Sequence, residues 1–408
     1  MKRILNILLV ALAAGFASCG SPSGTDISAA RAFVKESARR IITASTRTVS
    51  EPGPWQGISF VQPCDYPTYE GGCWVRDYYY GCLTGEIAPA DMKGVYGWYK
   101  SHVDTAGVNA WQVPDVIIHN GAALWVGDRP ALDGNPFLVM LAALYYRMSD
   151  DEAFIRAEMP FLYALMDNAG KQDGLAYNSD HPNRVGFGFE DSVHMTGQLA
   201  YCSVLYYDAA LRALEICREL KIDGYPFEDI AKGVKDAFLP TFWDGKVLHA
   251  STGLCHAQFD VLAAAYAVSC GLVDDRRTAR DIVDAFWQYN DELQVNGFYK
   301  YVPEAFYHSP DQVWESANQY EWAKVDIYQW GGFWTIGTPH ILNAIMKVKG
   351  RKAIKPMVEN LAGYVRENGL FEECRNRDGS WRNALYYVQT VGAVDAVLRM
   401  WDGEPWTY

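Results

Sequence analysis

Residues 352–367 read K-A-I-K-P-M-V-E-N-L-A-G-Y-V-R-E, and their apolar side chains recur at steps of three and four. This spacing places those side chains along one face of an α-helix, the face that a globular protein buries. Residues 194–219 are instead apolar around much of the helix circumference, which predicts a helix inside the fold. The two segments therefore indicate an outer and an inner layer of helices.

The helical pattern extends over most of the chain. Strand signals are few and short, as at Trp243–His249. Besides the two segments above, the pattern predicts helices at residues 28–46, 89–104, 136–149, 151–168, 226–238, 257–271, 276–290, 339–348 and 384–402.

Helices in consecutive pairs fit either a helical solenoid or a toroid of six helical hairpins. A solenoid predicts an internal repeat of about 34–47 residues, and the sequence shows none. Long loops rich in glycine and aromatic residues favour the toroid, in which loops at one end of the inner helices build the site. These loops cover residues 50–88, 105–135, 171–192 and 296–338. We therefore expect an all-α toroid.

The N-terminus has the pattern of an export signal. Lys2 and Arg3 precede an apolar run from Ile4 to Phe16, which small residues follow, and the run is too short to span a membrane. In A-S-C-G, Cys19 stands where a bacterial lipobox places its lipidated cysteine, with an ordinary signal peptide as the alternative. We expect an exported envelope lipoprotein, periplasmic or attached to the outer membrane, with a signal peptide at 1–18, a lipidated tether at 19–27 and one domain at 28–408.

The composition limits the classes of molecule that the protein is expected to bind. A net charge of −13 argues against nucleic acid and anionic lipid surfaces, which need a basic protein face. The 14 tryptophans and 26 tyrosines suit stacking against sugar rings, although they also pack well in cores. No C-x-x-C pair occurs and the eight histidines are scattered, so we predict no metal site and no cofactor.

Export would allow disulfides among the cysteines. Cys64 and Cys73 lie in one loop-like stretch and form the favoured pair. Cys202, Cys217 and Cys270 fall within apolar helical patterns and are expected to be buried thiols.

Four segments combine charged and aromatic residues with glycine or proline. They are G-G-C-W-V-R-D-Y-Y-Y-G (71–81), D-R-P-A-L-D-G-N-P-F (128–137), G-F-G-F-E-D-S-V-H-M (186–195) and F-E-E-C-R-N-R-D-G-S (371–380). In the first, Arg76 and Asp77 stand among bulky aromatic residues, where a charge needs a partner or a polar ligand. The pattern leaves two interpretations open, a buried ion pair and the floor of a pocket.

Acidic residues in these segments could carry out acetal hydrolysis, which needs one protonated carboxyl and one carboxylate. Glu190 has two aromatic neighbours in the sequence, Phe187 and Phe189. Burial among aromatic side chains would raise the pKa of such an acid. The alternative is that Glu190 only supplies a negative charge near a helix N-terminus.

The four segments together, in the order W-V-R-D, R-P-A-L-D-G-N-P, F-E-D and F-E-E-C-x-x-x-D-G, resemble the glucoamylase family, glycoside hydrolase family 15, and the wider group of six-hairpin glycosidases. The resemblance covers most of residues 55–400 as scattered motifs. It implies an (α/α)6 toroid with an exo-acting, inverting glycoside hydrolase activity. The substrate would be an oligosaccharide or polysaccharide fragment that loses its terminal sugar.

The resemblance also implies roles for the sugar-binding residues. Arg76 and Asp77 would bind sugar hydroxyls, Trp74 would form a wall of that subsite, and Asp133 would lie at the pocket edge. Further pocket lining is expected from Tyr328, Gln329, Trp330 and Trp334. For Trp334 the alternative is an aromatic contact that packs two hairpins together.

The catalytic roles follow from the same alignment of motifs. Glu190 corresponds to the general acid, and Asp191 to the second acid of that pair. Glu372 corresponds to the general base, with Glu373 as the alternative. The reserve candidates for the base are Glu321 and Asp326.

Two other functions remain open from the sequence. Unsaturated glucuronyl hydrolases share the (α/α)6 barrel and hydrate a double bond with an Asp, a role that F-E-D would give to Asp191. A lipid-anchored protein that binds glycans through Trp74, Trp330 and Trp334 without hydrolysing them is the other alternative.

Overall fold

The computed structural model describes residues 26–65, 67–125, 131–179, 186, 190–307, 312 and 326–406. The expected signal peptide and Cys19 lie outside the described residues, as do Phe187, Phe189 and Glu321. No described helix is both long enough and apolar enough to cross a bilayer.

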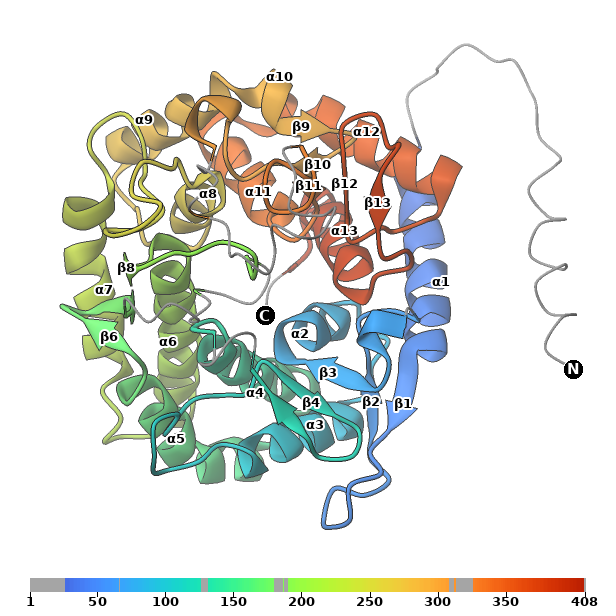
Figure 1. The fold of residues 1–408 in the computed structure, drawn as a ribbon, viewed down its shortest axis with the longest axis vertical. Helices are drawn as coiled ribbons and strands as arrows, with labels where there is room; N and C mark the ends of the chain where they lie inside the picture. The colour runs from blue at the N-terminus through green and yellow to red at the C-terminus, as the bar shows by residue number, and fades with distance from the viewer. Residues whose placement is uncertain are drawn as a thin grey trace, which may run out of the picture.

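An inner ring of helices forms the centre of the fold (Figure 1). Each of these helices contacts the next one in the chain order, and the last contacts the first, so the ring is closed. All nine residues of the first are buried, and all nine of the fourth, because inner helices contact neighbours on every side. In the described chain they are α2 (Val75–Leu83), α4 (Gly134–Ser149), α6 (Ala200–Leu220), α8 (Val261–Ser269), α11 (Thr338–Lys349) and α13 (Val388–Asp402).

An outer layer alternates with this ring along the chain. Its helices bury one face and expose the other, as the spacing in residues 352–367 predicts for α12. They are α1 (Ile27–Ser45), α3 (Pro89–Ser101), α5 (Glu152–Asp167), α7 (Phe227–Phe242), α9 (Arg276–Trp287) and α12 (Arg351–Asn368), and α10 (Asn290–Leu293) adds one short turn. Inner and outer helices make the predicted (α/α)6 toroid, and the segment 194–219 supplies the inner helix α6, as expected.

Short antiparallel strands brace the loops that lead into the inner helices. Two-residue and three-residue pairings hold the chain before α2, α6, α11 and α13 against neighbouring segments. The sheets are β1–β2 (Thr46–Thr48, Ser59–Val61), β3–β4–β5 (Gly72–Trp74, Val116–Ile118, Ala123–Leu124), β6–β7–β8 (Lys171–Gln172, Leu175–Asn178, Gly197–Gln198) and β13–β12–β11–β10–β9 (Arg382–Asn383, Cys374–Arg375, Phe333–Trp334, Phe298–Tyr299, Gln294–Val295). Two 3₁₀ turns cover Pro67–Tyr69 and Glu304–Phe306.

Three structural predictions from the sequence are wrong. The segment W-V-R-D-Y-Y-Y is not loop, because α2 begins at Val75, directly after β3. Trp243–His249 is not a strand but a turn, in which Asp244 accepts hydrogen bonds from two backbone amides and only isolated bridges form. Cys64 and Cys73 form no disulfide in the described structure, because they are buried in separate clusters, the first with Tyr387 and the second in the main core.

Candidate active site

A buried ion triad connects two neighbouring inner helices. Arg76, in the first turn of α2, lies with one guanidinium nitrogen (Nη2) 3.3 Å from Asp77 Oδ2 and the other (Nη1) 3.2 Å from Asp133 Oδ2, at the start of α4. Arg76 and Asp77 are 7% and 1% exposed. Burial raises the pKa of Asp77, and the Arg76 charge opposes that rise. We call Arg76, Asp77 and Asp133 the ion triad.

Asp191 lies just before α6, where a polar side chain from a distant loop fixes it. Gln329 Nε2 donates a hydrogen bond to Asp191 Oδ1 at 2.7 Å, and the Tyr328 hydroxyl donates to the same oxygen at 3.3 Å. Gln329 Oε1 in turn accepts from the Ser192 amide at 2.6 Å. Burial raises the pKa of Asp191 to about 6, so this carboxyl can hold or release a proton near neutral pH.

Glu373 lies on the segment that leads into α13. The Tyr69 hydroxyl and Asn383 Nδ2 donate to Glu373 Oε2 at 3.0 and 2.7 Å. Burial, with Asp77 and Asp191 nearby, raises the pKa of Glu373 to about 8, while Arg76 opposes the rise. Glu373, Asp77 and Asp191 therefore form one cluster of carboxyls around Arg76, which we call the acid cluster.

Glu372 faces away from the acid cluster. Its side chain is fully buried, and it accepts a hydrogen bond from the Tyr364 hydroxyl of α12. Its Oε1 lies 3.7 Å from Arg375 Nη1 and 3.6 Å from Arg382 Nε. The chain bends at Glu373, directly before β12, and Glu372 and Glu373 have different surroundings.

Glu190 lines a small pocket beside the acid cluster. Its pKa is raised well above the ordinary value by burial and by the neighbouring Asp260 and Asp191. Asp260 caps α8, accepting from the Ala263 amide at 2.8 Å, and burial raises its pKa to about 7. We call this pocket the chamber; its lining residues are Glu190, Met195, Tyr201, Ala250, Gln258, Asp260, Leu262, Tyr301 and Val302.

Of the residues that line the chamber, only Glu190 was a candidate from the sequence, and the polar residues Gln258 and Asp260 were not. An Asp directly before the apolar run 261–269 is a helix N-cap signal, so the position of Asp260 could have been found. Gln258 carries no comparable signal, since its burial depends on the loop that folds back over Ala250.

The remaining predicted residues lie at different distances from the acid cluster. Trp74 packs edge-on against Tyr69, the donor to Glu373, with ring centroids 5.3 Å apart. Trp334 is buried and packs behind Tyr328, to whose carbonyl it donates at 3.3 Å. Trp330 is half-buried, in the turn that carries Gln329. Asp326 is exposed and lies 3.9 Å from Lys300 Nζ, so the structure does not place this reserve candidate with the acids.

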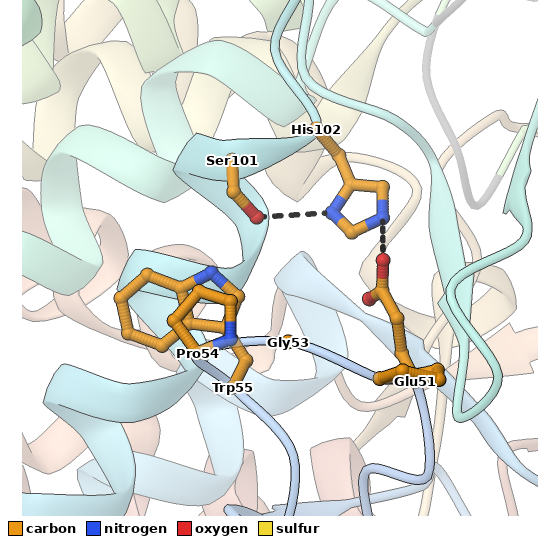
Figure 2. A pocket seen from close by; sticks show the side chains of 7 residues that line it. Glu51, Gly53, Pro54, Trp55, Ser101 and His102 are labelled. Atoms are coloured by element: carbon orange, nitrogen blue, oxygen red, sulfur yellow. Dashed lines mark hydrogen bonds and ion pairs between the residues drawn. The ribbon is translucent and has the colours of Figure 1, made fainter.

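A surface cavity of about 190 Å³ lies elsewhere, between the loop 51–57 and the end of α3 (Figure 2). Ser101 Oγ lies 3.3 Å from His102 Nδ1, and His102 Nε2 lies 3.5 Å from Glu51 Oε1, which resembles the order of a hydrolase triad. Ser101 Oγ, however, donates to the Trp98 carbonyl at 2.7 Å. Glu51 also accepts from Trp98 Nε1 at 2.7 Å, so these contacts anchor the loop to α3.

The described residues include no group of three His, Cys, Asp or Glu side chains arranged to hold a metal ion. The groups that the acid cluster and its neighbours can present to a substrate are carboxyls, an arginine, tyrosine hydroxyls and side-chain amides.

No protein-family model matches the sequence. No curated protein matches it either.

Solved structures match over almost the whole chain. A rhamnosidase from Klebsiella oxytoca with rhamnose bound has a TM-score of 0.63 and 13% identity, with 94% of this chain and 66% of that chain covered. A family 63 mannosylglycerate hydrolase from Thermus thermophilus in complex with glucose has a TM-score of 0.61 and 11% identity, covering 90% of this chain and 100% of that one. A glycosidase variant in complex with glucose has a TM-score of 0.60 and 15% identity, covering 96% and 100%.

These likenesses establish the fold class. The chain has the (α/α)6 architecture of six-hairpin glycosidases, and structural neighbours include glycoside hydrolases crystallised with sugars. The chain spans 66% of the rhamnosidase's length. None of these three structures is described as a member of glycoside hydrolase family 15, so the narrower resemblance of the motifs stays a prediction.

Proposed function

We propose that the protein is an exo-acting, inverting glycoside hydrolase in which Asp191 is the general acid and Glu373 the general base. The observation that carries this proposal is the acid cluster. One carboxyl comes from the segment before α6 and the other from the segment before α13, and both lie in the field of Arg76. Hydrolysis of a glycosidic bond needs two such carboxyls on opposite sides of the scissile bond.

The proposed reaction uses only these groups and water. Asp191 gives its proton to the glycosidic oxygen as the bond from that oxygen to the anomeric carbon breaks. Glu373 takes a proton from a water molecule whose oxygen forms the new bond to the same carbon. In this proposal Arg76 and Asp77 bind sugar hydroxyls and Trp74 contacts an apolar face of the ring, which the ion pair of the first two and the position of Trp74 against Tyr69 support.

The acid cluster retains one proton at neutral pH, and in the free protein the higher pKa of Glu373 places that proton there. With pKa values of about 6 for Asp191 and about 8 for Glu373, the two carboxyls together hold one proton at neutral pH. The proton can reside on either carboxyl of a coupled pair. Substrate binding would place it on Asp191, because the glycosidic oxygen accepts a hydrogen bond from the protonated acid.

Geometry favours these two residues over Glu190 and Glu372. Glu372 is held between Arg375 and Arg382 and faces away from the acid cluster. Glu190 faces the chamber, and Asp260 and Asp191 are the charged groups that raise its pKa. We therefore assign Glu372 to the stability of the α12–α13 loop and Glu190 to substrate binding.

Substitution of the carboxyls tests the assignment. We expect Asp191→Asn and Glu373→Gln each to lower kcat by about 10²–10⁴-fold on a panel of aryl glycosides and disaccharides of glucose, mannose and rhamnose. The matched control Glu372→Gln should keep kcat and instead lower the thermal unfolding temperature, because it removes a buried negative charge from two arginines.

Other outcomes would point elsewhere. Wild-type activity in Asp191→Asn would remove the proposed acid. Sugar binding without turnover in the wild-type protein would favour a glycan-binding function. The N-terminal sequence adds a second part to the proposal, namely that the enzyme is exported and anchored through lipidated Cys19.

A further inference from the structure

The chamber is a small pocket between α6 and α8 that is lined by both apolar and polar side chains. Glu190, Gln258 and Asp260 are 6%, 1% and 7% exposed, and Tyr201 and Tyr301 are buried beside them. The free volume is about 10 Å³, which is room for one water molecule or one hydroxyl group. A whole sugar ring does not fit, but a single substituent of a ring does.

Three side-chain atoms in the chamber have no hydrogen-bond partner within the described structure: Glu190 Oε2, Gln258 Oε1 and Gln258 Nε2. An unpaired buried polar group costs about 1–3 kcal/mol, and proteins pair nearly all such groups. Gln258 has both amide atoms unpaired, so the chamber lacks both a hydrogen-bond donor and a hydrogen-bond acceptor. A hydroxyl group is the simplest chemical group that supplies both.

The charges in the chamber select among hydroxyl-bearing groups. Two carboxyls, Glu190 and Asp260, line it, and its lining includes no arginine, lysine or histidine among the described residues. A carboxylate entering the chamber would find no cation to balance its charge, because the chamber supplies only Glu190 and Asp260, whose pKa values burial raises toward the protonated form; an unbalanced charge is unfavourable in a buried site. A neutral hydroxyl or hydroxymethyl group would find hydrogen-bond donors and acceptors in the chamber and would bring no charge that needs balancing.

The chamber belongs to the same region as the acid cluster. Glu190 precedes Asp191 in the chain, and Tyr201, in the first turn of α6, lies in the field of Arg76 and Asp133. A sugar held at the ion triad can therefore extend one substituent into the chamber.

We infer that the chamber receives a hydroxyl-bearing substituent of a neutral sugar through Gln258 and Glu190, and that it excludes uronic acids. This inference rests on the proposed function, because it specifies the sugar that the acid cluster would act on. Gln258 is then a specificity-determining residue, and Asp260 and Glu190 set the charge of the subsite.

A binding experiment on the full-length Asp191→Asn variant tests the inference without turnover. Titration calorimetry would use D-glucose, D-mannose and L-rhamnose, a deoxy analogue for each hydroxyl of the tightest binder, and D-glucuronate. We expect the neutral sugars to bind more than about 10-fold tighter than glucuronate. Adding Gln258→Leu should weaken the tightest binder about 10-fold or more, since two hydrogen bonds are lost, and should not weaken further the one deoxy analogue that lacks the buried hydroxyl.

Two further variants separate charge from structure. Glu190→Gln with Asp260→Asn keeps the size of both side chains and the helix cap, and it should raise the affinity for glucuronate relative to the neutral sugar. The exposed Gln56→Leu is the matched control and should leave every affinity unchanged. In the absence of sugar, Gln258→Leu should raise the unfolding temperature, because it replaces unpaired polar atoms with apolar ones.

Several results would overturn the inference. Unchanged affinities in Gln258→Leu, together with a lower unfolding temperature, would mean that Gln258 holds an ordered water for structural reasons. A preference for glucuronate in the Asp191→Asn protein would contradict the charge argument. Failure of the proposed function is a separate outcome, in which the wild-type protein hydrolyses none of the neutral glycosides, whatever the chamber binds.

Discussion

Arg76 is the residue on which the electrostatics of the site depend. Its guanidinium contacts Asp77 and Asp133 directly and opposes the raised pKa values of Asp191 and Glu373. One cation among so many carboxyls cannot keep all of them ionised, because each buried negative charge raises the pKa of the others. The excess of carboxyls is what retains a proton at neutral pH.

The proton shared by the acid cluster predicts a bell-shaped pH profile for kcat/KM. As pH falls below about 6, Asp191 and Glu373 are both protonated and the base is lost. As pH rises above about 8, both are ionised and the acid is lost. Steady-state assays on a hydrolysed aryl glycoside would measure the profile, with circular dichroism as the control for folding. A rate that stays constant across this whole range would contradict the assignment.

At the scale of elements, α2 and α13 approach each other closely. A Cβ placed on Gly392 of α13 would lie 2.1 Å from the Tyr80 carbonyl oxygen of α2, and backbone cannot move aside as a flexible side chain can. This glycine therefore allows the first and the last inner helices to meet at short distance.

A pair of glycine substitutions tests that packing. Gly392→Ala should lower the free energy of unfolding by about 1–3 kcal/mol or more, the usual range for overpacking a core. Gly233→Ala, in the middle of α7, meets its first atom only at 3.8 Å and should raise the same free energy by about 0.5–1 kcal/mol. Urea denaturation of both variants measures the difference. Equal effects of the same sign would show that the α2–α13 contact is not tight.

The sequence predicts the helices well wherever one face differs from the other. Residues 27–45 and 351–368 show the periodicity of outer helices, and both were expected within two residues of their observed ends. α2 was missed because its segment combines glycine with charged and aromatic residues, which is the composition of a loop. The two-residue strands were missed because they are too short to show an alternating pattern, and some, such as β10 and β11, also pair with partners far along the chain.

The site was predictable in its segments and less so in its residues. Motif order brought Arg76, Asp77, Asp191 and Glu373 to attention, and the structure places all four together. Motif order could not decide between Glu372 and Glu373, because the directions of these two side chains depend on how the chain bends before β12 and on the register of that strand. Register is set here by the pairing of Cys374 with Trp334 and Asn383, which no local pattern encodes.

At the scale of the whole molecule, the two ends of the described chain meet. Arg31 of α1 forms ion pairs with Asp402 and Glu404, which lie at and beyond the end of α13. The residues after α13 then turn toward the centre of the ring (Figure 1). There Trp406 packs against the buried His340, with ring centroids 5.1 Å apart. The tail thus covers the side chains at the centre of the ring.

Removal of this cover should be measurable. We expect Trp406→Ala to lower the free energy of unfolding by about 2 kcal/mol, less than the roughly 3–5 kcal/mol of a fully buried tryptophan, because Trp406 is half-buried. Burial lowers the pKa of His340 to about 3, and the variant should bring that pKa closer to its ordinary value, which NMR titration can follow. Leu254→Ala, at an exposed position, is the control. An unchanged His340 pKa would contradict this role of the tail.

The closed ring has a consequence for the protein during its synthesis. The proposed acid, Asp191, emerges long before the proposed base, Glu373, and the inner ring closes only when α13 reaches α2. A nascent chain that already has most of the helices thus has neither its base nor a sealed barrel. Catalytic competence would appear in a single late event, the docking of the last helix, so an incomplete chain would be inert toward any glycan it meets.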